Sequence, residues 1–595
     1  MLPKKLVITL LVFASVSGAA QKPIASKTAA QKNVSSATNE RADLLMDVIS
    51  QELNRATMEL SKVENAPYFT SYSVDDVEEM VIIGSNGAIL ISSHPHRRTA
   101  DVSVRVGSPA FDNTHAEGRR SGLTSGLLPL TDDRDAISRE LWRLTDREFK
   151  QAAQVYLRLK TEQAVRAKEE DDSPDFSQET FRSQAQKPAT TALSVDQKDW
   201  ETKLRRLSLE FNKYPLVYRS GVFLSASVQR HRFISSEKNR VSTTTPNIRV
   251  MVFAETTAED GMELMRVETF QAADQRHLPS EAELLLKINA VAHDLMALRG
   301  AKLAEPFNGP ALLSGRAAAV FFHEVLGHRV EGQRQRGDDE GMTFTKKVGQ
   351  AVLPPFLSVV DDPTIRELNG FELSGFYDYD DEAVAARRVN IIEDGVLKNF
   401  LMSRMPVKDF TTSNGHGRAQ AGAMPVGRQG NLIVTSKNTI SDAEMRQRFI
   451  QEIKNQKQPY GLYFEDIQGG FTLTTRSMPQ AFQVLPVMVW KVFADGHPDE
   501  LVRGVDIVGT PLAALNRIIV TGDKQFIFNG ICGAESGSVP VSAVAPAMLF
   551  SEIEVQRQKQ GHDRPPILTN PIAAVLGASP SDMKPSETKP SETKQ

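Results

Sequence analysis

Ala317-Ala318-Ala319-Val320-Phe321-Phe322 runs directly into His323-Glu324-Val325-Leu326-Gly327-His328, so an apolar run ends in a hexad with two histidines and a glutamate. Two imidazoles on either side of a carboxylate are typical of a hydrolytic zinc site. In the H-E-x-x-H arrangement the histidines share one face of a helix. Here they lie one residue further apart, about 140° around an ideal helix, so both can bind one metal only where the helix ends or bulges. Gly327 permits a π-type turn or a C-terminal unwinding at that point.

The only cysteine of the chain is the candidate third ligand. Cys532 lies in Asn529-Gly530-Ile531-Cys532-Gly533, where nearby glycines let the backbone come close to another group and leave the sulfur unobstructed. Zinc sites commonly recruit such a ligand from a distant segment. A lone cysteine is more often a small buried hydrophobic residue, and that interpretation is the alternative.

The first twenty residues predict export. Lys4 and Lys5 precede the apolar stretch 6–16, and the small residues Gly18 and Ala20 occupy the positions that a signal peptidase recognises. We therefore expect cleavage near Ala20 and a periplasmic or secreted protein, with an uncleaved anchor as the alternative. In an oxidising compartment a single cysteine has no internal disulfide partner, which favours its protection by a metal or by burial.

Length and composition indicate a large globular protein. The chain has 595 residues, of which 40% are hydrophobic, so two or three domains with substantial cores are expected. The net charge of -4 gives no electrostatic footprint for nucleic acid, and no stable membrane span is predicted beyond the leader. Residues 578–595 repeat a polar Lys-Pro-Ser-Glu-Thr unit and are expected to form a disordered tail.

Residue patterns predict an α+β fold whose first half, residues 21–305, is a mixed α/β domain. Ser280 is a predicted N-cap that forms a capping box with Glu283, and Ser85-Asn86-Gly87 is a hairpin signal. A charged, solvated insertion is predicted near 168–194. The expected helices span 41–63, 135–168 and 280–298, and the expected strands span 80–83, 88–92, 100–106, 222–228 and 247–254.

The second half, residues 306–577, is predicted to be a predominantly β catalytic domain that carries the His-Glu helix. In this half the residue pattern predicts short strands separated by turns that contain Gly, Asp and Pro. The expected strands include 389–392, 396–402 and 430–435.

The motifs of this second half resemble those of the TldD/PmbA metallopeptidases, and in particular the TldD branch that carries the H-E-x-x-x-H hexad. The similarity extends from about Gly309 to Ala547, so it is far more specific than one hexad. The matching segments are 323–328, 331–332, 359–364, 380–382, 393–397, 413–418, 428–431, 502–504 and 532–533.

The resemblance implies a zinc ion held by His323, His328 and Cys532, with Glu324 as the catalytic carboxylate. It also implies a two-domain dimer with an internal cavity that admits unfolded or extended peptides. The partner is either a second copy or a TldE-like protein that lacks the hexad. The predicted activity is zinc-dependent hydrolysis of peptide bonds, with zinc-activated water and Glu324 as general base. Members of this family are mostly cytoplasmic, so the export signal is a departure.

Three further residues are candidates for supporting roles. His416 and Arg418 lie in a glycine-spaced loop and are candidates for contacts to the substrate or to an oxyanion, with a turn role for His416 as the alternative. Glu331 either orients a ligand histidine or lies exposed at a helix end. The alternative function is a non-catalytic peptide-binding or assembly protein in which a closed, four-ligand zinc site is structural.

Overall fold

The computed structural model describes residues 43–115, 122–163, 173–180, 182–186, 195–336, 342–472 and 482–558, together with residues 193, 474, 568 and 571. The predicted signal peptide and the predicted polar tail lie outside the described residues. Helices and two large sheets make up the described chain, so the predicted α+β class is confirmed. The helices are α1 Leu44–Leu60, α2 Arg134–Gln163, α3 Gln197–Leu209, α4 Glu281–Gly300, α5 Gly315–Val325, α6 Asp442–Asn455 and α7 Pro511–Leu515.

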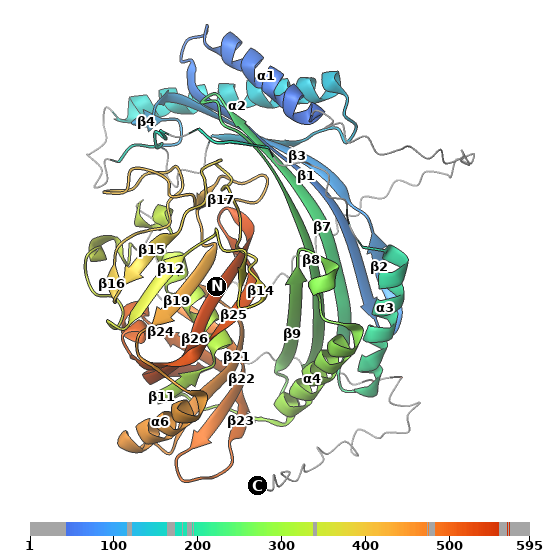
Figure 1. Ribbon diagram of the computed structural model, residues 1–595, viewed down its shortest axis with the longest axis vertical. Helices are drawn as coiled ribbons and strands as arrows, with labels where there is room; N and C mark the ends of the chain where they lie inside the picture. Colours follow the sequence, from blue (N-terminus) through green and yellow to red (C-terminus); the bar gives the residue numbers. More distant parts are fainter. Residues whose placement is uncertain are drawn as a thin grey trace. The chain divides into compact units, whose positions relative to one another are not determined.

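A nine-stranded sheet is built from the first half of the chain, and its central order is β4-β3-β1-β7-β8-β6. α1 and α2 lie side by side at one end of its long strands, whereas α3 and α4 lie near the other end (Figure 1). Its strands are β1 Pro67–Ser85, β2 Ala88–Ser93, β3 His96–Ser108, β4 Phe111–Asp112, β5 Leu123–Leu127, β6 Gln184–Gln186, β7 Arg219–Ser235, β8 Arg240–Thr257 and β9 Glu263–Ala272.

Local signals in this half act as predicted. Asn86 and Gly87 have positive φ angles of 50° and 79°, and Ser85 pairs with Ala88, which is the two-residue turn that suits the twist of a hairpin. Ser280 and Glu283 form the reciprocal capping box at the start of α4.

The stretch near 168–194 is described only in part, and there Gln178, Thr180, Arg182 and Gln184 are exposed, whereas residues 175–177 differ from the predicted solvated insertion. Asp175 and Phe176 are buried rather than solvated. The Asp175 carboxylate accepts a hydrogen bond from the Asp112 amide, and the Arg336 guanidinium donates to the Pro174 carbonyl. These hydrogen bonds satisfy polar groups of the segment, so that part of it can be buried.

A thirteen-stranded sheet is built from the second half, and its central order is β10-β23-β22-β21-β11-β26-β19-β12-β15-β16. Its strands are β10 Lys302–Leu303, β11 Phe307–Leu313, β12 Leu357–Asp361, β15 Val389–Glu393, β16 Val396–Leu397, β19 Asn431–Ser436, β20 Thr439–Ile440, β21 Tyr460–Thr472, β22 Phe482–Phe493, β23 Glu500–Arg503, β24 Val505–Gly509, β25 Ile518–Ala534 and β26 Gly537–Arg557. Two small ribbons accompany it, formed by β13 Glu367–Leu368 with β14 Phe371–Glu372 and by β17 Gly417–Arg418 with β18 Val426–Gly427.

The prediction of a strand over 396–402 was wrong, because only Val396 and Leu397 pair as β16. Beyond that pair the chain leaves the sheet. The Leu401 amide donates to the Val330 carbonyl, and the Leu401 carbonyl accepts from the Gly332 amide, each at 2.8 Å. This segment therefore holds the chain that follows the His-Glu hexad.

α5 is the central helix of the second half. Its residues Ala317–Phe322 are all buried in the largest hydrophobic core, against side chains of β11, β21, β22 and β26. Burial of this apolar run on every side stabilises the short helix. No helix in the described part of the chain is long and apolar enough to cross a membrane.

Candidate metal centre

The end of α5 brings the two histidines of the hexad together. The Ser314 hydroxyl caps the start of the helix by accepting from the Ala317 amide, and the helix ends at Val325. A 3-10 turn over Gly327–Val330 follows, which is the C-terminal unwinding predicted from the five-residue spacing. As a result, the ring centroids of His323 and His328 lie 4.9 Å apart.

Gly327 allows this turn because there is no room for a side chain at this position, and its φ angle is not positive. A Cβ atom there would lie 2.0 Å from the Gln429 Oε1 atom. The Arg329 guanidinium meanwhile donates to the carbonyls of Glu324 and Val325 at 3.1 Å each. Arg329 therefore satisfies carbonyls that the helix end leaves without a partner.

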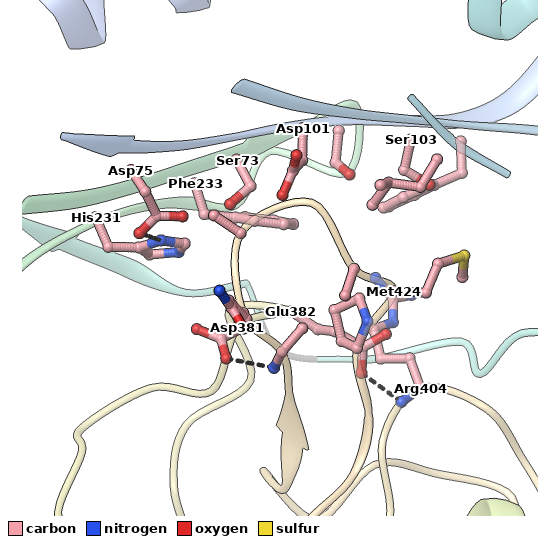
Figure 2. Close-up of a pocket in the computed structure, with 18 of the residues that line it drawn as sticks. Ser73, Asp75, Asp101, Ser103, His231, Phe233, Asp381, Glu382, Arg404 and Met424 are labelled. Atoms are coloured by element: carbon pink, nitrogen blue, oxygen red, sulfur yellow. Dashed lines mark hydrogen bonds and ion pairs between the residues drawn. The ribbon is translucent and has the colours of Figure 1, made fainter. Parts of the chain in front are cut away.

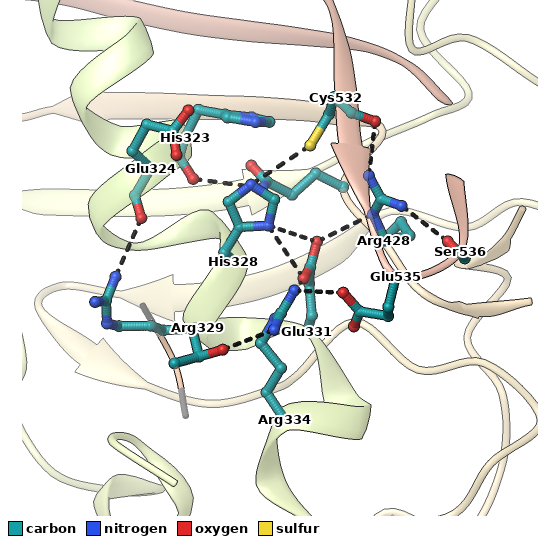
Figure 3. Close-up of polar contacts among 12 residues, drawn as sticks. His323, Glu324, His328, Arg329, Glu331, Arg334, Arg428, Cys532, Glu535 and Ser536 are labelled. Atoms are coloured by element: carbon teal, nitrogen blue, oxygen red, sulfur yellow. Dashed lines mark hydrogen bonds and ion pairs between the residues drawn. The ribbon is translucent and has the colours of Figure 1, made fainter. Parts of the chain in front are cut away.

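Cys532, on β25, joins the two histidines (Figure 3). One ligand atom from each of His323, His328 and Cys532 lies within 4.8 Å of the others, and each residue is only 6% exposed. The Cys532 Sγ atom is 3.4 Å from the His328 Nε2 atom. Ligands of a tetrahedral zinc are spaced about 3.5 Å apart, so a small contraction suits this group to zinc.

The electrostatics of the three residues also suit a zinc ion. Burial alone would raise the pKa of the Cys532 thiol, but the imidazoles of His328 and His323 hold that pKa well below its ordinary value. The His323 Nδ1 atom is buried and has no hydrogen-bond partner in the described structure. A thiolate and two imidazoles form a donor set that zinc prefers.

Glu331 orients the ring of His328. This carboxylate is completely buried, and its two oxygens lie 3.1 and 3.2 Å from the His328 Nδ1 atom. Burial alone would raise the pKa of Glu331, but His328 and Arg334 lower it to about 2. With Nδ1 engaged by Glu331, the Nε2 atom of His328 faces Cys532. Of the two interpretations of Glu331, the structure shows the orienting one.

Arg428 supports the centre from the other side, and its role was not predicted. It is completely buried, and it donates to the Cys532 carbonyl and the Ser536 hydroxyl at 2.8 Å each. Its Nε atom lies 3.4 Å from the Glu331 carboxylate. In the sequence, Arg428 stands out only as the first residue of the matching segment 428–431, and no spacing signal connects it to the hexad.

A cavity of about 390 Å³ opens beside the three donors. Glu324 lines it and is 8% exposed, and burial raises the pKa of this carboxylate. Gly470 of β21 lies directly against it, because a Cβ atom there would be 2.8 Å from the Glu324 Cγ atom. Other lining residues are Val320, Arg334, Gln468, Gly469, Thr472, Phe528, Ile531, Gly533, Ala534, Glu535 and Val541.

His416 and Arg418 do not line this cavity, so the structure does not place them as the predicted substrate or oxyanion contacts. His416 is completely buried and its Nε2 atom lies 3.3 Å from the Asp361 carboxylate. Arg418 donates to the Gln429 carbonyl at 2.6 Å and lies over the Tyr377 ring. Both side chains hold the loops that surround the centre.

Comparison with known proteins places the second half of the chain in a defined group. Residues 307–557 match the family model described as the PmbA/TldA metallopeptidase C-terminal domain. A metalloprotease from Archaeoglobus fulgidus is 28% identical over 239 residues, which cover 40% of this chain and 51% of that protein. A zinc metalloprotease TldD homolog from Saccharolobus solfataricus is 25% identical over 251 residues, which cover 41% of this chain and 51% of that protein. The chain thus spans about half the length of these curated relatives.

The fold likeness extends over more of the chain. The structure of TldE from Thermococcus kodakarensis covers 85% of this chain and 100% of its own, with a TM-score of 0.56 and 12% identity. The nine-stranded sheet of the first half therefore belongs to the shared fold, because a match of this breadth cannot be confined to residues 307–557.

Proposed function

We propose, from the match of residues 307–557 to the PmbA/TldA metallopeptidase C-terminal domain, that this protein is a zinc-dependent metallopeptidase that hydrolyses peptide bonds in unfolded or extended peptides. The observation that carries the proposal is the convergence of His323, His328 and Cys532 at a cavity that Glu324 also lines. Two imidazoles, a thiolate and an adjacent carboxylate are the parts that such a reaction needs.

The residues around the cavity would have two separate roles, metal binding and proton transfer. When bound by His323, His328 and Cys532, zinc supplies the Lewis acidity that activates water and polarises a peptide carbonyl. Glu324 accepts the proton of the attacking water and returns it to the leaving amine. Its burial favours proton uptake, since the raised pKa makes the carboxylate a stronger base.

The cavity wall supports an extended substrate. β21 pairs with β11 only over Leu462–Phe464, so beyond Phe464 this edge has no strand partner in the described chain. Gly469 and Gly470 line the cavity along the same strand and carry no side chain that would keep a peptide away. An extended peptide can add to such an edge through its backbone, whereas a folded domain cannot enter a space of 390 Å³.

A structural zinc in a non-catalytic binding protein is less well supported. A closed structural site needs four protein ligands. Among the described residues the group of candidate donors contains three, and the cavity reaches them.

Dimerisation and export are further parts of the proposal. The fold shared with TldE of Thermococcus kodakarensis supports pairing with a second copy or with a TldE-like partner, and the native mass in light scattering tests it. Export rests on residues 1–20 alone, and N-terminal sequencing of the mature protein tests the cleavage near Ala20.

Glu324→Gln tests the proposed mechanism. The amide keeps the size of the side chain but does not accept a proton, so zinc should stay bound while cleavage of an unstructured peptide falls at least about 100-fold. Glu554→Gln, at an exposed position of β26, is the control and should cleave normally. A Glu324→Gln protein that cleaves at the wild-type rate would exclude Glu324 as the general base.

A further inference from the structure

A second cavity, of about 60 Å³, lies between strands of the nine-stranded sheet and loops of the second half (Figure 2). Asp101, Ser73 and Ser103 point into it from the strands, and Asp381 and Glu382 approach it from the loops. It shares no lining residue with the cavity at the metal centre. The two cavities are therefore lined by separate residues.

Four carboxyl groups and three basic side chains line the cavity. Its carboxylates are Asp75, Asp101, Asp381 and Glu382, and its cations are Arg105, His231 and Arg404. The two arginines are already paired with carboxylates that do not line the cavity, since Arg105 lies 2.8 Å from Asp112 and Arg404 lies 2.7 Å from Glu237. His231 is paired with Asp75 at 3.1 Å. No ion pair in the described part of the chain involves Asp101 or Asp381, and the charge of His231 acts on both from a greater distance.

Asp101 has an unused acceptor inside the cavity. The residue is 7% exposed, and its Oδ2 atom accepts a hydrogen bond from the Gly422 amide at 2.8 Å. The Ser125 hydroxyl also hydrogen-bonds to this carboxylate, and the Oδ1 atom is buried without a hydrogen-bond partner of its own in the described structure. A buried carboxylate oxygen without a donor is unfavourable, so this atom indicates a missing donor.

Asp381 lines the same space and is half-buried. It accepts a hydrogen bond from the Ala419 amide at 2.8 Å, and no ion pair in the described part of the chain involves it. Burial raises the pKa of both Asp101 and Asp381. A cation placed between the strands and the loops would relieve this penalty.

The size of the cavity limits what can enter. A water molecule needs about 10–15 Å³ of such space, so the cavity of about 60 Å³ holds about four to six non-hydrogen atoms. Phe69, Phe176 and Phe233 supply apolar surface, and Ser73 and Ser103 supply hydroxyls. The carboxylates are not gathered as metal ligands, because the candidate metal group in the described residues is the one at His323, His328 and Cys532.

We propose that this cavity binds a small primary amine as its ammonium ion. The ammonium group would donate to the Asp101 Oδ1 atom and to Asp381, and its short alkyl part would lie against the phenylalanine rings. An ammonium group carries three donors and no acceptor, which matches unpaired carboxylates and hydroxyls. A small anion does not suit a cavity whose uncompensated groups are acidic.

Titration of the full-length mature protein with n-propylamine at neutral pH, followed by ligand-observed NMR, tests the proposal. A ligand with four non-hydrogen atoms is expected to bind with a Kd of roughly 0.1–10 mM. The neutral isostere 1-propanol should bind at least about tenfold more weakly, because it lacks the charge.

Two isosteric variants locate the binding site. Asp101→Asn and Asp381→Asn keep an oxygen for the Gly422 and Ala419 amides but remove the charge, so each should raise the Kd for n-propylamine at least about tenfold. Asp523→Asn, at an exposed position of β25, is the matched control and should leave the Kd unchanged. If one cavity variant does not fold, as judged by circular dichroism, the other decides the test.

Three results would overturn the proposal. The first is wild-type protein that does not bind n-propylamine up to about 100 mM, a concentration well above the expected range. The second is 1-propanol that binds as tightly as the amine. The third is a folded Asp101→Asn or Asp381→Asn protein with the wild-type Kd.

Discussion

The ring of His328 is held in place by a carboxylate that contributes no atom to the group of candidate ligands. Glu331 is within hydrogen-bonding distance of His328 Nδ1 and is itself held by Arg334 at 2.8 Å and by Arg428 at 3.4 Å. Such partners fix which nitrogen of a histidine faces the metal, and they raise the basicity of the ligand. Single residues outside the ligand set therefore affect how tightly zinc is bound.

Glu331→Gln should weaken zinc binding about 10–100-fold, because the amide orients His328 less firmly and removes the negative charge beside its ring. Competition with a chromophoric chelator measures the affinity. Glu535→Gln is the matched control, since Glu535 also pairs with Arg334, at 2.9 Å, and is not among the partners of His328. Equal zinc affinities of the Glu331→Gln and wild-type proteins would show that Glu331 has no orienting role.

Gly470→Ala should impair catalysis without removing zinc. The new Cβ atom would lie 2.8 Å from the Glu324 Cγ atom and 2.9 Å from the Gln483 carbonyl oxygen, so the carboxylate has to move. We expect kcat to fall at least about tenfold, since displacements near 1 Å at a catalytic group have large effects. Gly300→Ala, at the end of α4, is the control, because its Cβ atom would meet no atom within 4 Å and Gly300 does not line the cavity. Normal kcat in Gly470→Ala would argue against Glu324 as the reacting carboxylate.

At the scale of elements, α5 could be predicted in part from the sequence. The five-residue spacing of the histidines and the glycine between them predicted the unwinding after Val325, and the 3-10 turn Gly327–Val330 confirms it. The contacts of that turn could not be predicted. Leu401 lies in a run with strand-like residues, yet it bonds to Val330 and Gly332 instead of to a sheet. A residue's strand propensity reflects how well its side chain fits a pleated sheet surface. It does not identify the segment to which that residue hydrogen-bonds.

Ser280→Ala should lower the free energy of unfolding by about 1 kcal/mol, because it removes the hydrogen bond that caps α4 and disrupts the capping box with Glu283. Urea denaturation measures the change. Lys287→Ala, at an exposed position inside the same helix, is the control and should change the free energy by less than about 0.5 kcal/mol. An unchanged Ser280→Ala protein would mean that packing alone fixes the start of the helix.

At the scale of the whole molecule, the residues hardest to predict are those whose contacts are far away in the sequence. Cys532 was accessible to prediction because it is the only cysteine, although it is 204 residues from His328. Arg428 was not, since one arginine among many carries no signal until the chain is folded. His416 and Arg418 were predicted as site residues from a glycine-spaced loop, but burial against Asp361 and Tyr377 directs them away from the cavity.

The first sheet carries a pH-dependent contribution to stability. Burial alone would lower the pKa of His231, but the Asp75 carboxylate raises that pKa to about 9, above the value of about 6.5 in an unfolded chain. The contribution of protonated His231 is therefore fully present below about pH 6.5 and is lost as the pH rises through about 9. The slope in this window is at most about 1.4 kcal/mol per pH unit.

Denaturation of the wild-type and His231→Gln proteins between about pH 6 and pH 10 tests this contribution. The stability difference between them should shrink as the pH rises. His497→Gln, at a histidine whose side chain is 73% exposed, should follow the wild-type curve. A constant difference between wild type and His231→Gln across this range would contradict the assignment of a raised pKa to His231.

The central claim is that His323, His328 and Cys532 hold a zinc ion that the proposed peptidase requires. The most direct measurement is the metal content of the purified mature protein and of Cys532→Ser, with cleavage of an unstructured peptide library measured on both. We predict about one zinc per wild-type chain, and loss of both zinc and cleavage in the variant, because the third ligand is removed. Wild-type protein that stays free of zinc and inactive when zinc is supplied would contradict the claim.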